Sequence, residues 1–236
     1  YWSPEQIART LKRMSPNDSH RRVSHEAIYN ALYVMPRGSL KKELIACLRQ
    51  GNGKRRPRSR GKDRRQQIPE LVSIHMRPPE IADRLMPGHW EGDLIMGANN
   101  RSAVGTLVER TTRLVILAKV DGTTATAAAV GFSDKLNEVP RALRLSMTYD
   151  QGREMVKHAE ITQKTGTAIY FADPHSPWQR GSNENTNGLL RQYLPKGTDL
   201  SVYSQEELDE IADSLNTRPR KTLDWRTPLE VYAEVL

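Results

Sequence analysis

Apolar and polar positions recur with two different periods along this chain, and the change of period divides it into a helical first part and a mixed second part. In the first part the apolar residues recur every three or four positions, which is the spacing of one face of an α-helix. Ser3 and Ser24 precede two such runs and can cap the helices that these runs predict. A third helix is predicted over residues 40–50. We therefore expect a small all-α domain over residues 1–53.

From residue 89 onward the apolar residues alternate with a period of two, which is typical of β-strands. In the first predicted strand, residues 89–96, Glu91 and Asp93 share one face and Trp90 lies on the other. Further strands are predicted over residues 103–109, 113–120, 143–149 and 168–171. Helices are predicted over residues 124–136, 154–163 and 205–215, and one begins near Ser182. The segment 68–236 therefore reads as an α/β domain of five strands flanked by helices.

The positive charge of the chain is concentrated between its two parts. The net charge is +8, yet residues 54–65 alone carry eight Lys or Arg against one Asp, whereas residues 66–236 carry nineteen against twenty-three acids. A segment without apolar residues cannot fold alone, so we interpret residues 54–67 as a basic linker or arm. A polyanion is expected to dock on the first part and on this arm.

Composition restricts the setting in which the protein works. The single cysteine, Cys47, excludes an internal disulfide framework and fits a reducing cytoplasm. No apolar run approaches the ~18 residues of a membrane span, and no signal peptide is recognisable. The sequence has no cluster of His and Cys for zinc and no glycine-rich phosphate loop followed by Lys. Because it begins at Tyr1 without a methionine, we interpret the chain as a fragment of a longer protein.

Three carboxylates stand out as candidate catalytic groups. Asp93 and Asp150 fall on or at the end of predicted strands, where a charge is costly unless a cation or a hydrogen-bond partner is present. Glu184 is separated from Asp150 by the thirty-three residues 151–183 and falls on the helix that begins near Ser182, on a polar stripe with Asn187 and Arg191. The alternative for Glu184 taken alone is an ordinary solvated helix face.

Four sequence motifs surround these acids. They are His-Trp-Glu-Gly-Asp-Leu-Ile at 89–95, Tyr-Asp-Gln-Gly at 149–152, Ser-Pro-Trp-Gln-Arg-Gly at 176–181 ahead of Glu184, and Asn-Thr-Arg-Pro-Arg-Lys-Thr-Leu at 216–223. In this order and at these spacings they resemble the DDE transposases of the insertion-sequence-thirty family, whose catalytic domain is ribonuclease-H-like, as in retroviral integrases. The resemblance covers nearly the whole chain.

The resemblance implies a mixed five-stranded sheet in which the first and fourth strands are neighbours, so that Asp93 and Asp150 meet beside the helix that bears Glu184. These three residues would be both the catalytic and the metal-binding groups. Asp93 would bridge two Mg²⁺ ions, Asp150 would hold one and Glu184 the other, and Mn²⁺ is expected to substitute. Glu91, on the same face as Asp93, is the best rival as a metal ligand.

Candidate DNA contacts lie in three places. The outer side of the second helix of a predicted helix-turn-helix carries His25, Glu26, Tyr29, Asn30 and Tyr33. The basic arm carries Lys54, Arg55, Arg56, Arg58 and Arg60. Trp178, Arg180 and Arg191 lie near the predicted triad. The structural alternatives are an ordinary helical pair, a solvated tether and, for Trp178, a side chain that covers the core.

The expected function is therefore that of a DNA transposase. Its partner would be double-stranded DNA, both transposon ends with inverted repeats and target DNA, bound by a homodimer on paired ends. It would act in the bacterial cytoplasm, associated with the nucleoid. The resemblance implies metal-dependent cleavage of one strand and attack of the freed 3′-hydroxyl on target DNA. Two rivals remain: a DNA-binding regulator with a non-catalytic sheet domain, and a metal-dependent nuclease without strand transfer.

Overall fold

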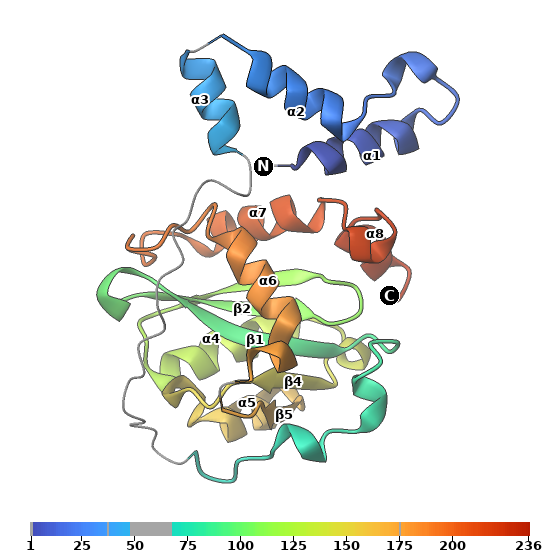
Figure 1. Ribbon diagram of the computed structural model, residues 1–236. Coiled ribbons are helices and arrows are strands. Elements are labelled where there is room, and N and C mark those ends of the chain that lie inside the picture. The colour runs from blue at the N-terminus through green and yellow to red at the C-terminus, as the bar shows by residue number, and fades with distance from the viewer. Residues whose placement is uncertain (1, 37, 48–67, 175) are drawn as a thin grey trace. The chain divides into compact units, whose positions relative to one another are not determined.

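The computed structural model describes residues 2–36, 38–47, 68–174 and 176–236, and the chain divides by its contacts into two units. One unit is formed by Tyr1–Lys62 and Arg218–Val231, the other by Asp63–Thr217 and Tyr232–Leu236. The sequence pattern alone assigns residues 218–231 to the last segment, 68–236, whereas their contacts group them with the first unit. Figure 1 shows the elements of each unit.

The first unit contains three short helices, α1 (Pro4–Met14), α2 (His25–Val34) and α3 (Ser39–Ala46). The Ser3 hydroxyl accepts the backbone N–H of Gln6, and the Gln6 side chain accepts the N–H of Ser3, so the predicted capping box is present. Ser24 caps α2 in the same way, through the backbone N–H of Ala27. The third helix is described only to residue 47, because residues 48–50 lie outside the described part of the chain.

A segment near the end of the chain folds against α1. The Arg13 guanidinium makes two hydrogen bonds of 2.9 Å to the Glu230 carboxylate, and Gln6 donates to the carbonyl of Pro219 at 2.8 Å. Arg9 lies over the ring of Trp225, 5.4 Å from its centroid. This segment continues into α8 (Pro228–Ala233). Residues more than two hundred positions apart thus form part of one folded unit.

The second unit is built on one mixed sheet with the strand order β3-β2-β1-β4-β5. Its strands are β1 (His89–Met96), β2 (Ala103–Glu109), β3 (Val115–Val120), β4 (Ser146–Tyr149) and β5 (Ala168–Phe171). β1, β2 and β3 are antiparallel neighbours, whereas β4 runs parallel to both β1 and β5. The ribonuclease-H-like fold, with the first and fourth strands side by side, is therefore confirmed.

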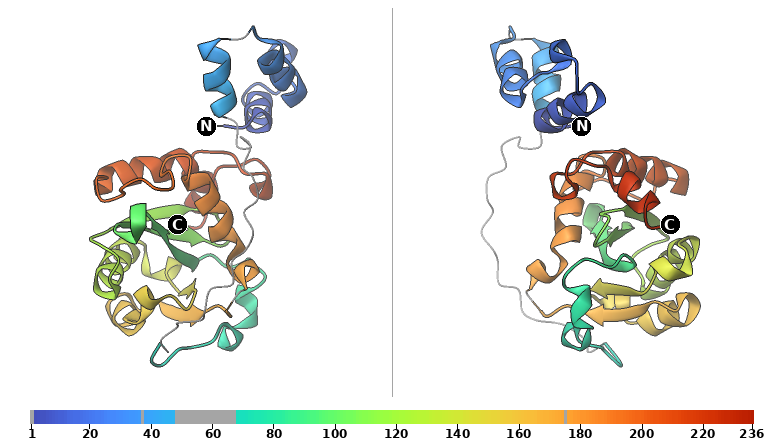
Figure 2. Two further views of the ribbon diagram at one scale, coloured as in Figure 1. Left: turned by 60° about the vertical axis from the view of Figure 1, so that its left-hand side comes forward. Right: turned by 90° about the vertical axis from the view of Figure 1, so that its right-hand side faces the viewer.

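Helices cover both faces of this sheet (Figure 2). On one face, α4 (Ala125–Glu138) and α5 (His158–Thr165) pack over a core that includes Trp90, Phe132 and Tyr149. On the other face, α6 (Gly181–Leu190) and α7 (Gln205–Asn216) bury a second core that includes Ile95 and Leu190. The alternation predicted for β1 is thus confirmed, because Trp90 and Ile95 belong to different cores.

Several predicted boundaries shift for identifiable reasons. β3 begins at Val115 instead of residue 113, because Arg113 has a left-handed backbone (φ 64°) in the turn before it. The helix predicted over residues 154–163 is split into a 3₁₀ turn, Arg153–Met155, and α5, which Gly166 ends in a left-handed conformation. Within the described part of the chain, no helix is both long and apolar enough to cross a membrane.

Candidate active site

β1 presents two acids, Glu91 and Asp93, to the helix that packs above it. Because side chains alternate along a strand, both lie on the face covered by α6. The backbone N–H of Asn183 donates to Glu91 Oε2 at 2.9 Å, and Asn187 Nδ2 donates to Asp93 Oδ2 at 2.9 Å. Asn183 and Asn187 are four residues apart and therefore on one side of the helix. Each acid of β1 thus has its own contact with α6.

Asp93 and Asp150 are brought together by a single arginine. Arg180 Nη1 lies 3.5 Å from Asp93 Oδ1, and Arg180 Nη2 lies 3.1 Å from Asp150 Oδ2. Arg180 also donates to the carbonyl oxygen of Gly92 at 3.0 Å. The parallel pairing of β1 with β4, which sets Glu91 opposite Thr148, explains the meeting, because the next residues on that face are Asp93 and Asp150.

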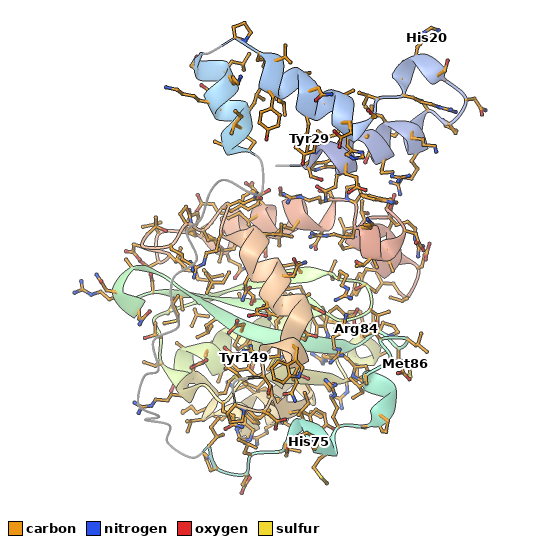
Figure 3. All side chains as sticks on the ribbon, in the orientation of Figure 1. His20, Tyr29, His75, Arg84, Met86 and Tyr149 are labelled. Carbon is orange, nitrogen blue, oxygen red and sulfur yellow. The ribbon has the colours of Figure 1, made fainter. Side chains whose placement is uncertain are left out.

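The ring of Tyr149 packs against the guanidinium of Arg180. Arg180 Cζ lies 5.9 Å from the centroid of the Tyr149 ring, and Figure 3 shows that ring below the start of α6. Tyr149 is fully buried, and burial raises the pKa of its hydroxyl well above the ordinary value. The phenol is therefore neutral, and it contributes a packing surface and no charge to the site.

Burial and mutual repulsion shift the carboxylates of the site. Burial raises the pKa of Asp93, and the neighbouring Asp150 raises it further, against the lowering effect of Arg180. Burial also raises the pKa of Glu154, with Asp150 as a further cause. For Arg180, burial lowers the pKa, but the two aspartates outweigh it and raise the value overall. The three carboxylates of Asp93, Asp150 and Glu154 therefore outnumber the guanidinium of Arg180.

Glu154 is a member of this group that the sequence reasoning missed. It lies in the 3₁₀ turn after β4, and a side chain at Gly152 would collide with its carboxylate. Its position four residues after Asp150 is the only signal that the sequence offers, and it is weak, because the pattern predicts an ordinary helix there. The turn rather than a helix is what folds Glu154 back toward the sheet.

Glu184 does not join the other acids in this structure. Its side chain is exposed on α6, and among the described residues no three His, Cys, Asp or Glu side chains are arranged to hold a metal ion. Glu184 does precede Asn187 by three residues, a spacing that sets the two Cβ atoms about 5–6 Å apart on a helix. Asn187 in turn bonds to Asp93. Asp93 and Asp150 therefore share one arginine, whereas Glu184 lies one helical turn from Asn187.

The donor set suits a hard divalent cation in place of the guanidinium. Two carboxylates already converge on one positive charge, and Asn187 Oδ1 is buried without a hydrogen-bond partner among the described residues. Carboxylate and amide oxygens are the ligands that Mg²⁺ prefers. The arginine therefore occupies the position of a cation, and the surrounding oxygens fit a metal ion there.

The other predicted contact residues have different environments. Trp178 is 72% exposed, so it does not cover the core. Arg191 is half-buried and donates to the carbonyl oxygens of Met96 and Leu194, at 3.1 and 3.3 Å. On α2, His25, Glu26, Asn30 and Tyr33 are exposed and Tyr29 is half-buried, with its ring stacked on that of Tyr33. Outside the described residues lie Lys54, Arg55, Arg56, Arg58 and Arg60.

Comparison with known proteins gives consistent matches. Residues 83–177 match the family described as integrase core domain. The chain is 66% identical over 235 residues to the transposase for insertion sequence element IS1086 of Cupriavidus metallidurans, covering 100% of this chain and 69% of that protein. It is 44% identical over 233 residues to the transposase of insertion sequence element IS30A of Escherichia coli K12, covering 98% and 61%. A solved catalytic core domain of BIV integrase is 19% identical, with a TM-score of 0.47, and the match covers 63% of this chain and 95% of that one.

Proposed function

Because this chain belongs to the insertion-sequence-thirty family of DDE transposases, we propose that it binds the inverted-repeat ends of a transposon, cleaves one DNA strand at each end and joins the freed 3′-hydroxyl to target DNA. The observation that carries the proposal is the convergence of Asp93 and Asp150 on one cationic group. The chain spans 69% and 61% of the two relatives above, so the activity of the whole protein is part of the proposal.

We propose that Asp93 and Asp150 hold the divalent metal ions on which this enzyme class depends, two Mg²⁺ ions that Mn²⁺ can replace. Bound there, such ions would lower the pKa of the attacking hydroxyl or water and stabilise the departing oxygen. Asp93, oriented by Asn187, is assigned the bridging position between the two sites. Two adjacent carboxylates, one of them half-buried with a raised pKa, are stabilised by any cation between them.

Glu184 is assigned as the third ligand, reached by rotation of its side chain. Its exposure leaves the side chain free to change rotamer, and it lies within one helical turn of Asn187, which binds Asp93. Glu184→Gln should then lower Mn²⁺ affinity without changing the folded stability, because an exposed glutamate contributes little to packing. Unchanged Mn²⁺ binding in this variant would remove Glu184 from the site.

Arg180 and Trp178 are assigned to the DNA. When metal ions take the place of the guanidinium, Arg180 becomes available to a phosphate beside the reacting bond. Trp178, exposed two residues earlier, is placed to stack on an unpaired base. Substitution Trp178→Ala should weaken the binding of single-stranded flanks more than that of intact duplex. Equal losses for both substrates would argue against stacking.

The first unit and the basic arm are assigned to recognition of the transposon ends. The exposed side of α2, with Asn30 and Tyr33, is suited to a major groove as the second helix of a helix-turn-helix. If so, Asn30→Ala should weaken binding to the inverted repeat by about 1–3 kcal/mol and leave binding to unrelated DNA unchanged. Equal losses on both DNAs for Asn30→Ala would contradict base readout.

Deletion of residues 54–65 should instead flatten the salt dependence of binding to both DNAs. An unchanged salt dependence after the deletion would remove the arm from the DNA.

A strand-joining assay tests the central proposal. The protein is incubated with pre-nicked transposon-end DNA, a target plasmid and Mg²⁺, and joined products are measured for the wild type and for Asp93→Asn. Joined products that depend on Asp93 support a transposase. Cleaved ends without joining indicate the nuclease, and DNA binding with neither product indicates the regulator. The number of ends in each complex, measured with two differently labelled ends, tests the proposed homodimer, and complexes that hold one label only would contradict it.

A further inference from the structure

Four arginines gather around the buried carboxylate of Glu91, two residues before Asp93 on β1. They are Arg77, Arg84, Arg110 and Arg113. Arg110 Nε lies 3.7 Å from Glu91 Oε1, and both side chains are almost fully buried. Figure 3 labels Arg84 near the start of α6. The cluster therefore lies on the same face of the sheet as the pair Asp93 and Asp150.

Hydrogen bonds hold two further arginines close to Glu91. Arg77 Nη1 donates to Thr148 Oγ1 at 3.1 Å, and Thr148 is the residue of β4 that pairs with Glu91. Arg113 donates to the hydroxyl of Ser182, next to the residue whose backbone N–H binds Glu91. Segments from before β1 and after β2 thus bring guanidinium groups to one place, beside the start of α6.

The cluster has an excess of positive charge. Glu109, the second acid nearby, is already bound by four backbone N–H groups, those of Gly88, His89, Thr111 and Thr112. Glu91 and Glu109 together supply two negative charges against the four guanidinium groups. Burial and the nearby Arg110 lower the pKa of Arg77 to about 10. Burial likewise lowers the pKa of Arg110 and of Arg113, and Arg84 adds repulsion to both.

Donors in this cluster are also left without acceptors. Arg110 is 4% exposed; its Nε faces Glu91 Oε1 at 3.7 Å, and its Nη1 atom is buried without a hydrogen-bond partner among the described residues. Unmatched buried donors of a charged group are unfavourable by several kcal/mol unless an acceptor arrives. Arg77, Arg84 and Arg113 are only half-buried, so a ligand can approach the group from solvent. The geometry calls for an anion with several oxygen acceptors.

We propose that Arg77, Arg84, Arg110 and Arg113 form a binding site for one phosphate of the DNA backbone. The choice of DNA rests on the proposed function; the anion site rests on the cluster itself. A guanidinium group binds a phosphate through two parallel N–H···O hydrogen bonds, and the cluster has donors that no acceptor among the described residues uses. Glu91 and Asp93 are about 6.6 Å apart along the strand. A phosphate held by the cluster therefore lies within a nucleotide or two of the bond at the carboxylates. The cluster holds the strand so that this bond reaches Asp93.

The salt dependence of DNA binding tests this site. Binding of a labelled duplex without transposon sequence is measured by anisotropy over a range of salt concentrations, for the wild-type chain and for Arg77→Gln/Arg84→Gln. Losing one phosphate contact should reduce the slope of log K against log salt by about 0.9. The charge-preserving pair Arg77→Lys/Arg84→Lys should retain most of the slope. Arg101→Gln, an exposed arginine in the same unit, serves as the matched control and should leave the slope unchanged.

The outcomes separate this inference from the proposed function. An unchanged slope in the Gln variant, with an unchanged unfolding midpoint, overturns the site even if strand joining depends on Asp93. A reduced slope without joining by the wild type supports the site and rejects the transposase. If inorganic phosphate, at constant ionic strength, raises the unfolding midpoint of the wild type only, and the slope is unchanged, the site takes free phosphate instead of DNA.

Discussion

Glu91 and Asp93 lie two residues apart on β1, on the same face of the sheet and under the same helix, but their surroundings have opposite charge. Around Glu91, four guanidinium groups outnumber the two carboxylates of Glu91 and Glu109, and the Glu91 side chain is fully buried. Asp93, which is partly accessible, shares the guanidinium of Arg180 with Asp150, and Glu154 adds a further negative charge nearby. Glu91 is a counter-charge among arginines inside the fold, whereas Asp93 belongs to a group in which the acids outnumber their arginine.

The difference teaches how to separate a structural acid from a reactive one where the sequence cannot. Both are acids on one face of a strand, and either could be a metal ligand by sequence alone. A carboxylate that neutralises buried arginines is bound to them, and its removal leaves their charge unpaired. A carboxylate that repels other carboxylates is stabilised by any added cation.

Asp93→Asn should separate activity from folding. Metal stabilisation of the reacting oxygens amounts to several kcal/mol, so nicking of a transposon end should fall by about a thousandfold. The neutral amide retains the shape of the side chain. Burial raises the pKa of Asp93 because it disfavours the carboxylate, and the substitution removes that charge, so the unfolding midpoint should not fall. Single-turnover nicking and urea unfolding are measured on the same preparation. Retained nicking would transfer the role to Glu91 and reverse the comparison.

Glu91→Gln should have its main effect on stability. Removing one partner of a buried ion pair typically destabilises a protein by about 3–5 kcal/mol, because the remaining charge is uncompensated. Urea unfolding measures the loss. Glu160→Gln, which removes an exposed pair with Lys157 of 2.9 Å, is the matched control and should change the stability by about 0–1 kcal/mol. If Glu91→Gln is as mild as the control, Glu91 is not the counter-charge described above.

Arg180→Gln should make the site more dependent on added cations. Without the guanidinium, Asp93 and Asp150 lose hydrogen bonds to a charged group, and stability in chelator should fall by about 2 kcal/mol. Metal ions then meet no competing cation, so Mg²⁺ should raise the thermal midpoint of the variant more than that of the wild type. Arg101→Gln should show neither change. Equal Mg²⁺ effects in wild type and variant would mean that Arg180 does not occupy the metal position.

The sequence predicted the parts of the fold that local pattern controls. The alternation in residues 89–96 located β1 and both its faces, and the capping residues Ser3 and Ser24 located two helix starts, because these signals are written within a few consecutive residues. The meeting of Asp93 with Asp150 came from the family resemblance and not from any local pattern. It is a property of strand order, which short-range periodicity does not specify.

The parts that the sequence did not reveal depend on contacts between distant segments. Arg77 meets Thr148, and Arg113 meets Ser182, across intervals of about seventy residues. Glu154 was missed because a 3₁₀ turn replaces the predicted helix. The grouping of residues 218–231 with α1 was missed because Gln6 and Arg13 bind partners more than two hundred positions away. Charge clusters of this kind exist only in the folded chain.

Asn187→Ala should give the smallest effect and shows how finely Asp93 must be positioned. The variant loses one hydrogen bond of 2.9 Å to the Asp93 carboxylate, which is worth about 1 kcal/mol of stability. A residue that orients a metal ligand typically affects activity by about ten- to a hundredfold when it is removed. Asn185→Ala, on the exposed side of α6, is the matched control for the helix itself. If nicking is unchanged in Asn187→Ala while stability falls, Asn187 holds α6 on the sheet without orienting Asp93. The bond between Asn187 and Asp93 would then be a packing contact of α6, like the one between Asn183 and Glu91.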